Sequence, residues 1–306
     1  MDLWTGDKVW NCVSAGLALA AFAAFGPASA QTANTHPDFA GRWQRNAMDP
    51  ELPASGPGPL VNLRRPMDDH TPNGGGDPLP LVGDYNNPIL KPAAAAVVKK
   101  AGELSLGGRI NPDPSNQCAA YEPPYAFTIQ LGVQFVWNGD ELLMLYPQDD
   151  QVRHVRMNAT HPRNLIPKPM GDSVAHWEGD TLVIDTVGVK VGPVSMVDRY
   201  GTPHSAAMHL VERYHLIDVN DAKAALAFHV RRTGPAGAFP VDPKSGEGLR
   251  MTYTVEDPEV FTTPWTANIT YLRSLAGWAE QICAENIVEY WPGENIAVPK
   301  AGKPEF

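Results

Sequence analysis

Hydrophobic and polar residues alternate with a period of two over much of the second half of the chain. The clearest case is residues 173–187, SVAHWEGDTLVIDTV, in which two runs flank a turn. Gly179 supplies the tight turn, and β-branched residues fill the run that follows it. Period-two alternation on both sides of a glycine turn is typical of an antiparallel pair of strands. The stretch therefore predicts a β-hairpin.

The same alternation recurs on both sides of this hairpin. It predicts further strands at residues 127–137, 141–146, 152–157, 208–217, 224–231, 249–256 and 265–272. A first strand opens at Gly41-Arg42-Trp43. Strands that follow one another in sequence usually pair in space, and a long meander avoids bare edges by closing on itself. About ten such strands predict an all-β fold, a single antiparallel up-and-down β-barrel.

Two stretches depart from this pattern. Residues 91–104, KPAAAAVVKKAGEL, predict the one short helix, with Pro92 in its first turn and Gly107 beyond its end. Residues 46–88 are rich in Pro, Gly and Asp and predict a long loop that covers the barrel. We expect residues 31–306 to form a single domain with an extended tail at residues 292–306.

The N-terminus predicts a signal peptide over residues 1–30. Residues 13–25 are apolar and too short to span a bilayer, and Ala28-Ser29-Ala30 fits a small-x-small cleavage site. We therefore expect a periplasmic or secreted protein that is cleaved near Ala30. No later run reaches the about 20 apolar residues of a transmembrane helix.

The amino-acid composition limits the fold classes and the kinds of partner that we expect. Hydrophobic residues make up 43% of the 306 residues, enough for a sizeable core, while 30 prolines and 27 glycines cut the chain into short elements. The formal net charge is −10 and no Lys/Arg cluster offsets it, so nucleic acid is not an expected partner.

Cleavage after Ala30 leaves Cys118 and Cys283, which predict a disulfide in an oxidising compartment. Two free buried thiols are the alternative.

Several motifs resemble those of known proteins. They are Gly41-Arg42-Trp43, the run Trp177-Glu178-Gly179-Asp180-Thr181-Leu182-Val183-Ile184-Asp185-Thr186, His204-Ser205, Glu212-Arg213, Asp257-Pro258 and Pro264-Trp265. Together they resemble a group of exported bacterial proteins without an assigned activity, over roughly residues 39–291. The Gly-x-Trp opening also resembles lipocalin-like (calycin) barrels, in which the Trp closes the barrel floor, often capped by an Arg. This second resemblance implies an internal cavity for a small molecule.

Glu212 is the sharpest candidate for chemistry. In residues 208–217, alternation places Glu212 on the same face as Leu210 and Tyr214. Burial among such side chains raises the pKa of a carboxylate and suits it to act as an acid or base. The alternative is a structural ion pair with an Arg across the sheet, such as Arg156 or Arg231.

Histidines and arginines supply candidate partners for Glu212. Val152, His154 and Arg156 share one face of their strand and Arg153 lies on the other, so either face directs one Arg inward. His154, His176 and His204 are candidate proton-transfer groups, and Arg156 or Arg213 could stabilise a developing oxyanion. Each of these side chains is also explained by an ordinary solvent-exposed or structural role.

Aromatic residues are candidates for lining a cavity, although core packing explains them equally well. They are Trp177, Tyr146, Tyr214, Trp265 and Tyr271. The sequence contains no Gly-x-Ser-x-Gly elbow, no phosphate-binding loop and no His or Cys spacing typical of zinc. We therefore predict neither an organic cofactor nor a metal.

Three functions fit these features. The first is a cofactor-independent acid–base enzyme, a lyase, hydratase or isomerase acting on a small apolar or carbonyl-bearing substrate. The second is a periplasmic binder or carrier of a small molecule, without chemistry. The third is a structural protein of the cell envelope. A His and a Glu facing one void favour the first, whereas a void whose polar groups are already paired favours the second.

Overall fold

The computed structural model describes residues 36–64, 80–109, 111–233, 236, 239–277 and 283. The predicted signal peptide and the predicted extended tail lie outside these residues, as does the middle of the predicted 46–88 loop. Within the described part of the chain, no helix is long and apolar enough to cross a membrane.

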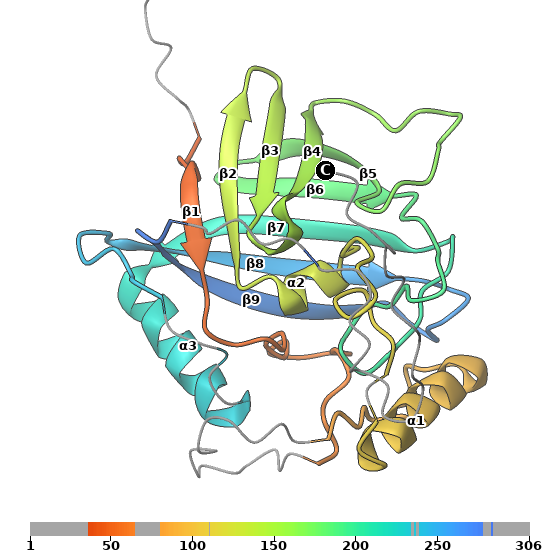
Figure 1. Ribbon diagram of the computed structural model, residues 1–306. Helices are drawn as coiled ribbons and strands as arrows, with labels where there is room; N and C mark the ends of the chain where they lie inside the picture. Colours follow the sequence, from red (N-terminus) through yellow and green to blue (C-terminus); the bar gives the residue numbers. More distant parts are fainter. Residues whose placement is uncertain are drawn as a thin grey trace, which may run out of the picture. The chain divides into compact units, whose positions relative to one another are not determined.

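The strands form one closed barrel in which each strand neighbours the next in sequence order (Figure 1). They are β1 (Gly41–Gln44), β2 (Gly132–Asn138), β3 (Glu141–Tyr146), β4 (Gln151–Met157), β5 (Asp172–Glu178), β6 (Thr181–Val187), β7 (His209–Asp218), β8 (Glu247–Glu256) and β9 (Trp265–Arg273). The predicted β-barrel and its sequential order are confirmed, and the 173–187 hairpin corresponds to β5 and β6.

The expectation of a wholly antiparallel barrel is wrong at one place. Strands β4 and β5 pair in parallel, whereas the other neighbouring strands around the described barrel pair antiparallel. The chain leaves β4 at Met157, returns along the barrel over residues 158–171 and enters β5 so that both strands run in the same direction. Parallel neighbours need such a return connection, and here an irregular excursion provides it instead of a helix.

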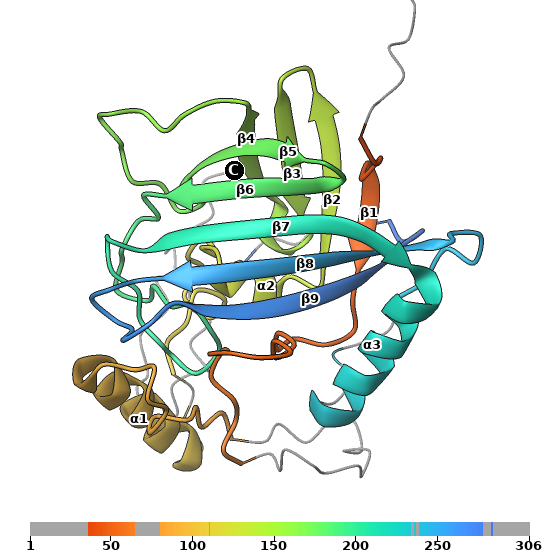
Figure 2. The same ribbon diagram turned by 180° about the vertical axis from the view of Figure 1, so that it is seen from behind.

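The barrel wall has two weak seams. In Figures 1 and 2, strands β1 to β4 run across the direction of β5 to β9. Where the two sets meet, pairing is short: β4 and β5 pair only from Val155↔Ser173 to Met157↔Ala175. The seam between β1 and β9 comprises only Trp43↔Arg273 and Gln44↔Leu272. By contrast, β7 and β8 pair along their whole length.

Helices differ most from the prediction. The expected helix is present as α1 (Pro92–Leu106), but α2 (Tyr125–Ile129), α3 (Val219–Thr233) and the 3-10 turn η1 (Gln148–Asp150) were not expected. The predicted strand at 127–137 therefore begins late, at Gly132, because α2 occupies its first residues. The predicted strand at 224–231 is wrong, since these residues belong to α3.

The spacing of the buried residues explains why residues 224–231 are helical. Ala222, Leu226 and His229 are the buried side chains of α3, at the i, i+4, i+7 spacing of one helix face. Ala222 and Leu226 pack with Leu272 on the outer surface of β9. Asp221 in the first turn and Arg231 and Arg232 in the last turn also suit the helix dipole.

Trp43 anchors one end of the barrel. Its side chain is fully buried, and its indole N–H donates to the Phe39 carbonyl at 2.9 Å. The Arg273 guanidinium, from the last strand, lies 4.3 Å from the centroid of the Trp43 ring and also donates to the Ala40 carbonyl at 2.7 Å. This contact joins the first strand to the last by a cation–π interaction.

The two cysteines of the predicted mature chain are bonded to each other. Cys118 and Cys283 form a disulfide, with their Cα atoms 5.5 Å apart. The prediction is confirmed, and the alternative of two free thiols is wrong. The bond ties the segment before α2 to a point beyond β9.

Candidate functional site

Glu212 points into the barrel, as its alternation predicts. Its side chain is 0% exposed. Arg153 donates to both carboxylate oxygens, from Nη2 to Oε1 at 2.6 Å and from Nη1 to Oε2 at 3.0 Å. The Tyr214 hydroxyl donates to Oε2 at 2.8 Å. The expected alternative of a structural ion pair is therefore present, but the partner is Arg153 on β4 and not Arg156 or Arg231.

The remaining donors of Arg153 are also engaged. Nε donates to Ser173 Oγ at 3.0 Å, and Nη2 donates to Thr186 Oγ1 at 2.6 Å. Burial by itself lowers the pKa of Arg153, but the adjacent Glu212 charge outweighs it and holds that pKa above its ordinary value. The guanidinium therefore stays charged, and the network joins β4, β5, β6 and β7 inside the barrel.

The predicted partners of Glu212 mostly lie on the outside of the barrel. His154 contacts Glu141 at 2.9 Å and its side chain is 64% exposed. Arg156 donates to Asp172 at 2.7 Å, while His176 and Arg213 both bond to Glu178. The structure does not bring these side chains together with Glu212, because they occupy the opposite face of the strands. Their catalytic roles stay predictions.

His204 lies in a second buried pair. Its side chain is fully buried, and Nε2 is 3.1 Å from Oε2 of Glu122. The neighbouring Ser205 donates from its hydroxyl to Asp257 at 2.7 Å. These contacts fix the entry to β7 against the segment before α2 and against the end of β8. His204 is thus paired with Glu122 and not with Glu212.

The predicted aromatic residues divide between the core and one end of the barrel. Tyr146, Tyr214, Trp265 and Tyr271 are each at most 4% exposed, and burial raises the pKa of Tyr146 to about 12. Trp177 is partly exposed and stacks on His36, with ring centroids 4.5 Å apart. The role of these residues in lining a ligand cavity stays a prediction.

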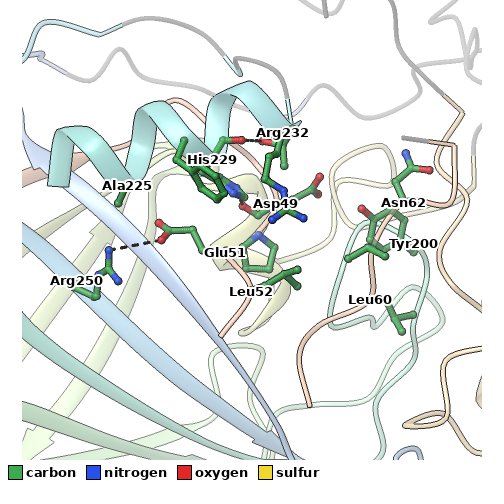
Figure 3. A pocket seen from close by; sticks show the side chains of 14 residues that line it. Asp49, Glu51, Leu52, Leu60, Asn62, Tyr200, Ala225, His229, Arg232 and Arg250 are labelled. Carbon is green, nitrogen blue, oxygen red and sulfur yellow. Dashed lines mark hydrogen bonds and ion pairs between the residues drawn. The ribbon is translucent and has the colours of Figure 1, made fainter. Parts of the chain in front are cut away.

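A cleft of about 250 Å³ lies outside the barrel, between α3 and the segment 49–62 (Figure 3). We call it the α3 cleft. Its lining residues come from that segment, from α3, and from Tyr200 and Arg250. They are Asp49, Pro50, Glu51, Leu52, Leu60, Val61, Asn62, Tyr200, Ala225, Phe228, His229, Arg232, Thr233 and Arg250.

Backbone pairing fixes the segment that forms one wall of the α3 cleft. The Glu51 amide donates to the Asn268 carbonyl at 2.8 Å, and the Asn268 amide donates back to Glu51 at 2.9 Å. The Thr266 amide donates to the Pro57 carbonyl at 3.0 Å. The segment thus continues the sheet along β9, and α3 forms the facing wall because its buried face packs on the same strand.

The two carboxylates that line the α3 cleft are each paired with an arginine. Glu51 and Arg250 approach to 3.7 Å, and Asp49 accepts a hydrogen bond from Arg199 at 3.2 Å. His229 Nε2 lies 2.6 Å from the Asp49 carbonyl. Burial, assisted by the positive charge of Arg45, lowers the pKa of His229. The imidazole is therefore neutral near pH 7, with Nε2–H as the donor to Asp49.

Sequence reasoning did not find this cleft. Treating residues 224–231 as a strand removed the wall that carries Ala225, Phe228 and His229. The helical spacing of Ala222, Leu226 and His229 was the signal that could have identified it. The other wall belongs to the predicted 46–88 loop, whose composition gave no indication that part of it pairs with β9.

The described residues contain no group of three or more His, Cys, Asp or Glu side chains placed to hold a metal ion. No protein-family model matches the chain, and neither the curated proteins nor the solved structures yield a match. The function is therefore argued from the geometry of the site.

Proposed function

We propose that this protein binds a small, uncharged and largely apolar molecule in the α3 cleft, as a binder or carrier without chemistry. The observation that carries this proposal is that the cleft combines apolar walls with carboxylates that are each already paired with a cation. Among the three functions expected from the sequence, this combination favours a binding protein.

Apolar side chains provide the body of the site. Leu52 and Leu60 come from the 49–62 segment, Ala225 and Phe228 from α3, and Tyr200 from the loop before β7. Phe228 is 52% exposed, so an apolar ligand removes part of its ring from water. The cleft volume of about 250 Å³ is just below the range of about 300–1,000 Å³ typical of drug-sized ligands, which favours a small ligand.

The charges around the cleft favour an uncharged ligand. Glu51 faces Arg250, and Asp49 faces Arg199, so each carboxylate already has a cation. A charged ligand would be desolvated there without gaining an unpaired counter-ion, and an unpaired buried charge is costly.

The sequence resemblances and the compartment support the same proposal. The Trp43–Arg273 contact is the arrangement implied by the calycin resemblance, whose members bind small molecules. The parallel β4–β5 pair departs from a simple up-and-down barrel. A disulfide suits the oxidising compartment expected for a periplasmic or secreted protein.

Acid–base catalysis is less favoured. Both carboxylate oxygens of Glu212 accept hydrogen bonds from Arg153, and its predicted His partners lie elsewhere. His204 and Glu122 form a buried pair, but neither residue lines the α3 cleft.

A fluorescent probe can test the proposed site. The neutral naphthalene dye prodan should bind the wild-type protein with a blue-shifted emission, and its anionic relative 1-anilinonaphthalene-8-sulfonate should bind more weakly. Ala225→Trp fills the cleft, so we expect prodan affinity to fall by about tenfold or more, equivalent to about 1.4 kcal/mol. Ala227→Trp, on an exposed position of the same helix, is the matched control and should bind as wild type. Unchanged prodan affinity in a folded Ala225→Trp variant would contradict the proposal.

A further inference from the structure

The two weak seams of the barrel differ in whether another segment of the chain pairs with the open strand edge. At the β1–β9 seam, the β9 edge beyond β1 is met by the chain's own extended segment, through Glu51 and Pro57. At the β4–β5 seam, β4 pairs with β5 only from Val155 to Met157. The first half of β4 therefore has β3 on one side and no paired strand among the described residues on the other.

Hydrogen bonds at the end of β4 show which of its backbone groups face this gap. The Met157 amide donates toward β3, to the Asp140 carbonyl at 2.8 Å. The next amide, of Asn158, donates toward β5, to the Ala175 carbonyl at 2.6 Å. Backbone groups alternate sides along a strand, so Val152 and His154 direct their N–H and C=O groups away from β3. The first pair of the β4–β5 seam, Val155↔Ser173, uses the His154 carbonyl as an acceptor for the Ser173 amide. No described residue forms a hydrogen bond with the His154 amide or with either backbone group of Val152.

A groove of about 550 Å³ lies beside this open edge. One side is β4, with Gln151, Val152, His154 and Arg156, and the other is the end of the excursion, from Lys168 to Ser173. Val152 is 44% exposed, so its aliphatic side chain presents apolar surface beside the open edge. Bare edges of this kind are templates for another strand, and proteins usually protect them.

The charges in the groove indicate what such a strand carries. His154 contacts Glu141 at 2.9 Å and Arg156 contacts Asp172 at 2.7 Å, so these four side chains already have partners. Lys168 forms no ion pair with any described residue. A carboxylate on the incoming strand would therefore find a cation at the excursion side of the groove.

We propose that the open edge of β4 is a docking site for an extended peptide strand that carries a carboxylate next to Lys168. The strand pairs with the N–H and C=O groups of Val152 and with the N–H of His154, and it covers the Val152 side chain, a case of β-strand addition. The 51–57 segment is the internal precedent, since it pairs with β9 at the other seam in the same way. This site is separate from the α3 cleft and does not depend on the proposed ligand.

Peptide titration followed by amide NMR tests this site. The probe is the acetylated, amidated tetrapeptide Val-Thr-Val-Asp, compared with a copy that is N-methylated at alternate amides and a copy with Asn in place of Asp. We expect the amide signals of Val152 and His154 to shift with the first peptide and not with the methylated copy. The Asn copy should bind severalfold more weakly, and Lys168→Gln should reduce affinity for the Asp peptide to the same extent.

Protein variants provide the second arm. Val152→Pro removes an N–H that faces the gap while leaving the β3 side of the strand intact, so it should abolish the shift at His154. Val152→Thr keeps the N–H and should retain binding. If Val152→Pro does not fold, the comparison of the Asp peptide with its methylated copy on the wild-type protein still tests the proposal. The proposal would be overturned if the Asp peptide and its methylated copy bound equally well, or if millimolar Asp peptide shifted neither amide signal. It would also be overturned if the β4 edge paired with a second copy of the chain.

Discussion

The inner and outer faces of strands β4 to β7 carry charge networks built from similar residues but in opposite environments. Inside, Arg153 and Glu212 form one ion pair whose side chains are 1% and 0% exposed. Outside, His161 bonds to Asp172 at 2.6 Å and to Asp185 at 2.9 Å, and Asp185 also bonds to His209 at 2.9 Å. These outer side chains are between 12% and 36% exposed.

The two networks differ in whether their basic side chains, an arginine inside and histidines outside, change charge near neutral pH. The inner pair uses an arginine, which keeps its charge, and each of its three nitrogens donates to a buried acceptor. The outer network uses histidines. His161 has a carboxylate oxygen within hydrogen-bond distance of each ring nitrogen, and the hydrogen bond to Asp185 raises the pKa of His209. Burial thus makes the inner pair a fixed part of the fold, whereas solvent pH controls the outer one.

Breaking the inner pair should have the largest effect. Glu212→Gln leaves the Arg153 charge buried without a counter-ion, and we expect a loss of about 3–5 kcal/mol in the free energy of unfolding, measured by urea titration. The double variant Arg153→Met, Glu212→Leu removes both charges and should recover most of that loss. A loss below about 1 kcal/mol for Glu212→Gln would mean that the pair is not desolvated as described.

The outer network should produce a smaller effect that depends on pH. The hydrogen bond to Asp185 raises the pKa of His209 above 6.5, so its contribution is complete below pH 6.5 and is lost as pH rises through the folded-state pKa. The hydrogen bond from His209 lowers the pKa of Asp185 below 3.8, so that contribution is lost as pH falls through the lower value. Stability from this network is therefore greatest between about pH 4 and 6.5.

His209→Gln tests this window. We expect it to cost about 0.2–1 kcal/mol at pH 5.5 and less at pH 8.5, because the groups are partly exposed. Thermal unfolding at several pH values measures the difference in stability between the variant and the wild type. Burial lowers the pKa of His229, so His229 makes stability change with pH in the opposite direction, and this contribution cancels in the difference. His154→Gln is the control, since His154 contacts one carboxylate and is 64% exposed. A cost that grows above pH 7 would contradict the assignment.

The smallest expected effect is local. His161 ties the 158–171 excursion to β5 and β6, while Asn158 and Lys168 hold its two ends through the backbone. In His161→Asn, we expect faster amide hydrogen exchange between residues 159 and 167 and unchanged exchange in β7 and β8. Global unfolding should shift by less than about 0.5 kcal/mol, typical of a surface substitution. Faster exchange throughout the barrel would show that the outer network supports the core as well.

The two networks also show how far sequence patterns reach. Alternation correctly placed Glu212 inside and His154 and Arg156 on the opposite face from Arg153, because it depends only on the strand period. It did not identify Arg153 as the partner of Glu212, since β4 and β7 meet only through the curvature of the closed barrel. The parallel β4–β5 pair was missed for a related reason: pairing direction depends on how the 158–171 excursion returns the chain.

The sequence did not predict the α3 cleft because the hydrophobic pattern of residues 224–231 fits both a strand and a helix. Ala224 to Arg231 contains apolar residues that satisfy both a strand and a helix, and packing of Leu226 against Leu272 favours the helix. Cleft walls also come from residues 49–62 and from α3, far apart in sequence, and no periodicity relates them.

Native mass spectrometry of the protein purified from its native host tests most directly whether the ligand site lies in the α3 cleft. We predict that wild-type protein and Ala227→Trp retain one uncharged small molecule that dissociates on collisional activation, and that Ala225→Trp is isolated without it. An Ala225→Trp protein that is folded and retains the same molecule at the wild-type ratio would place the ligand elsewhere and contradict the account.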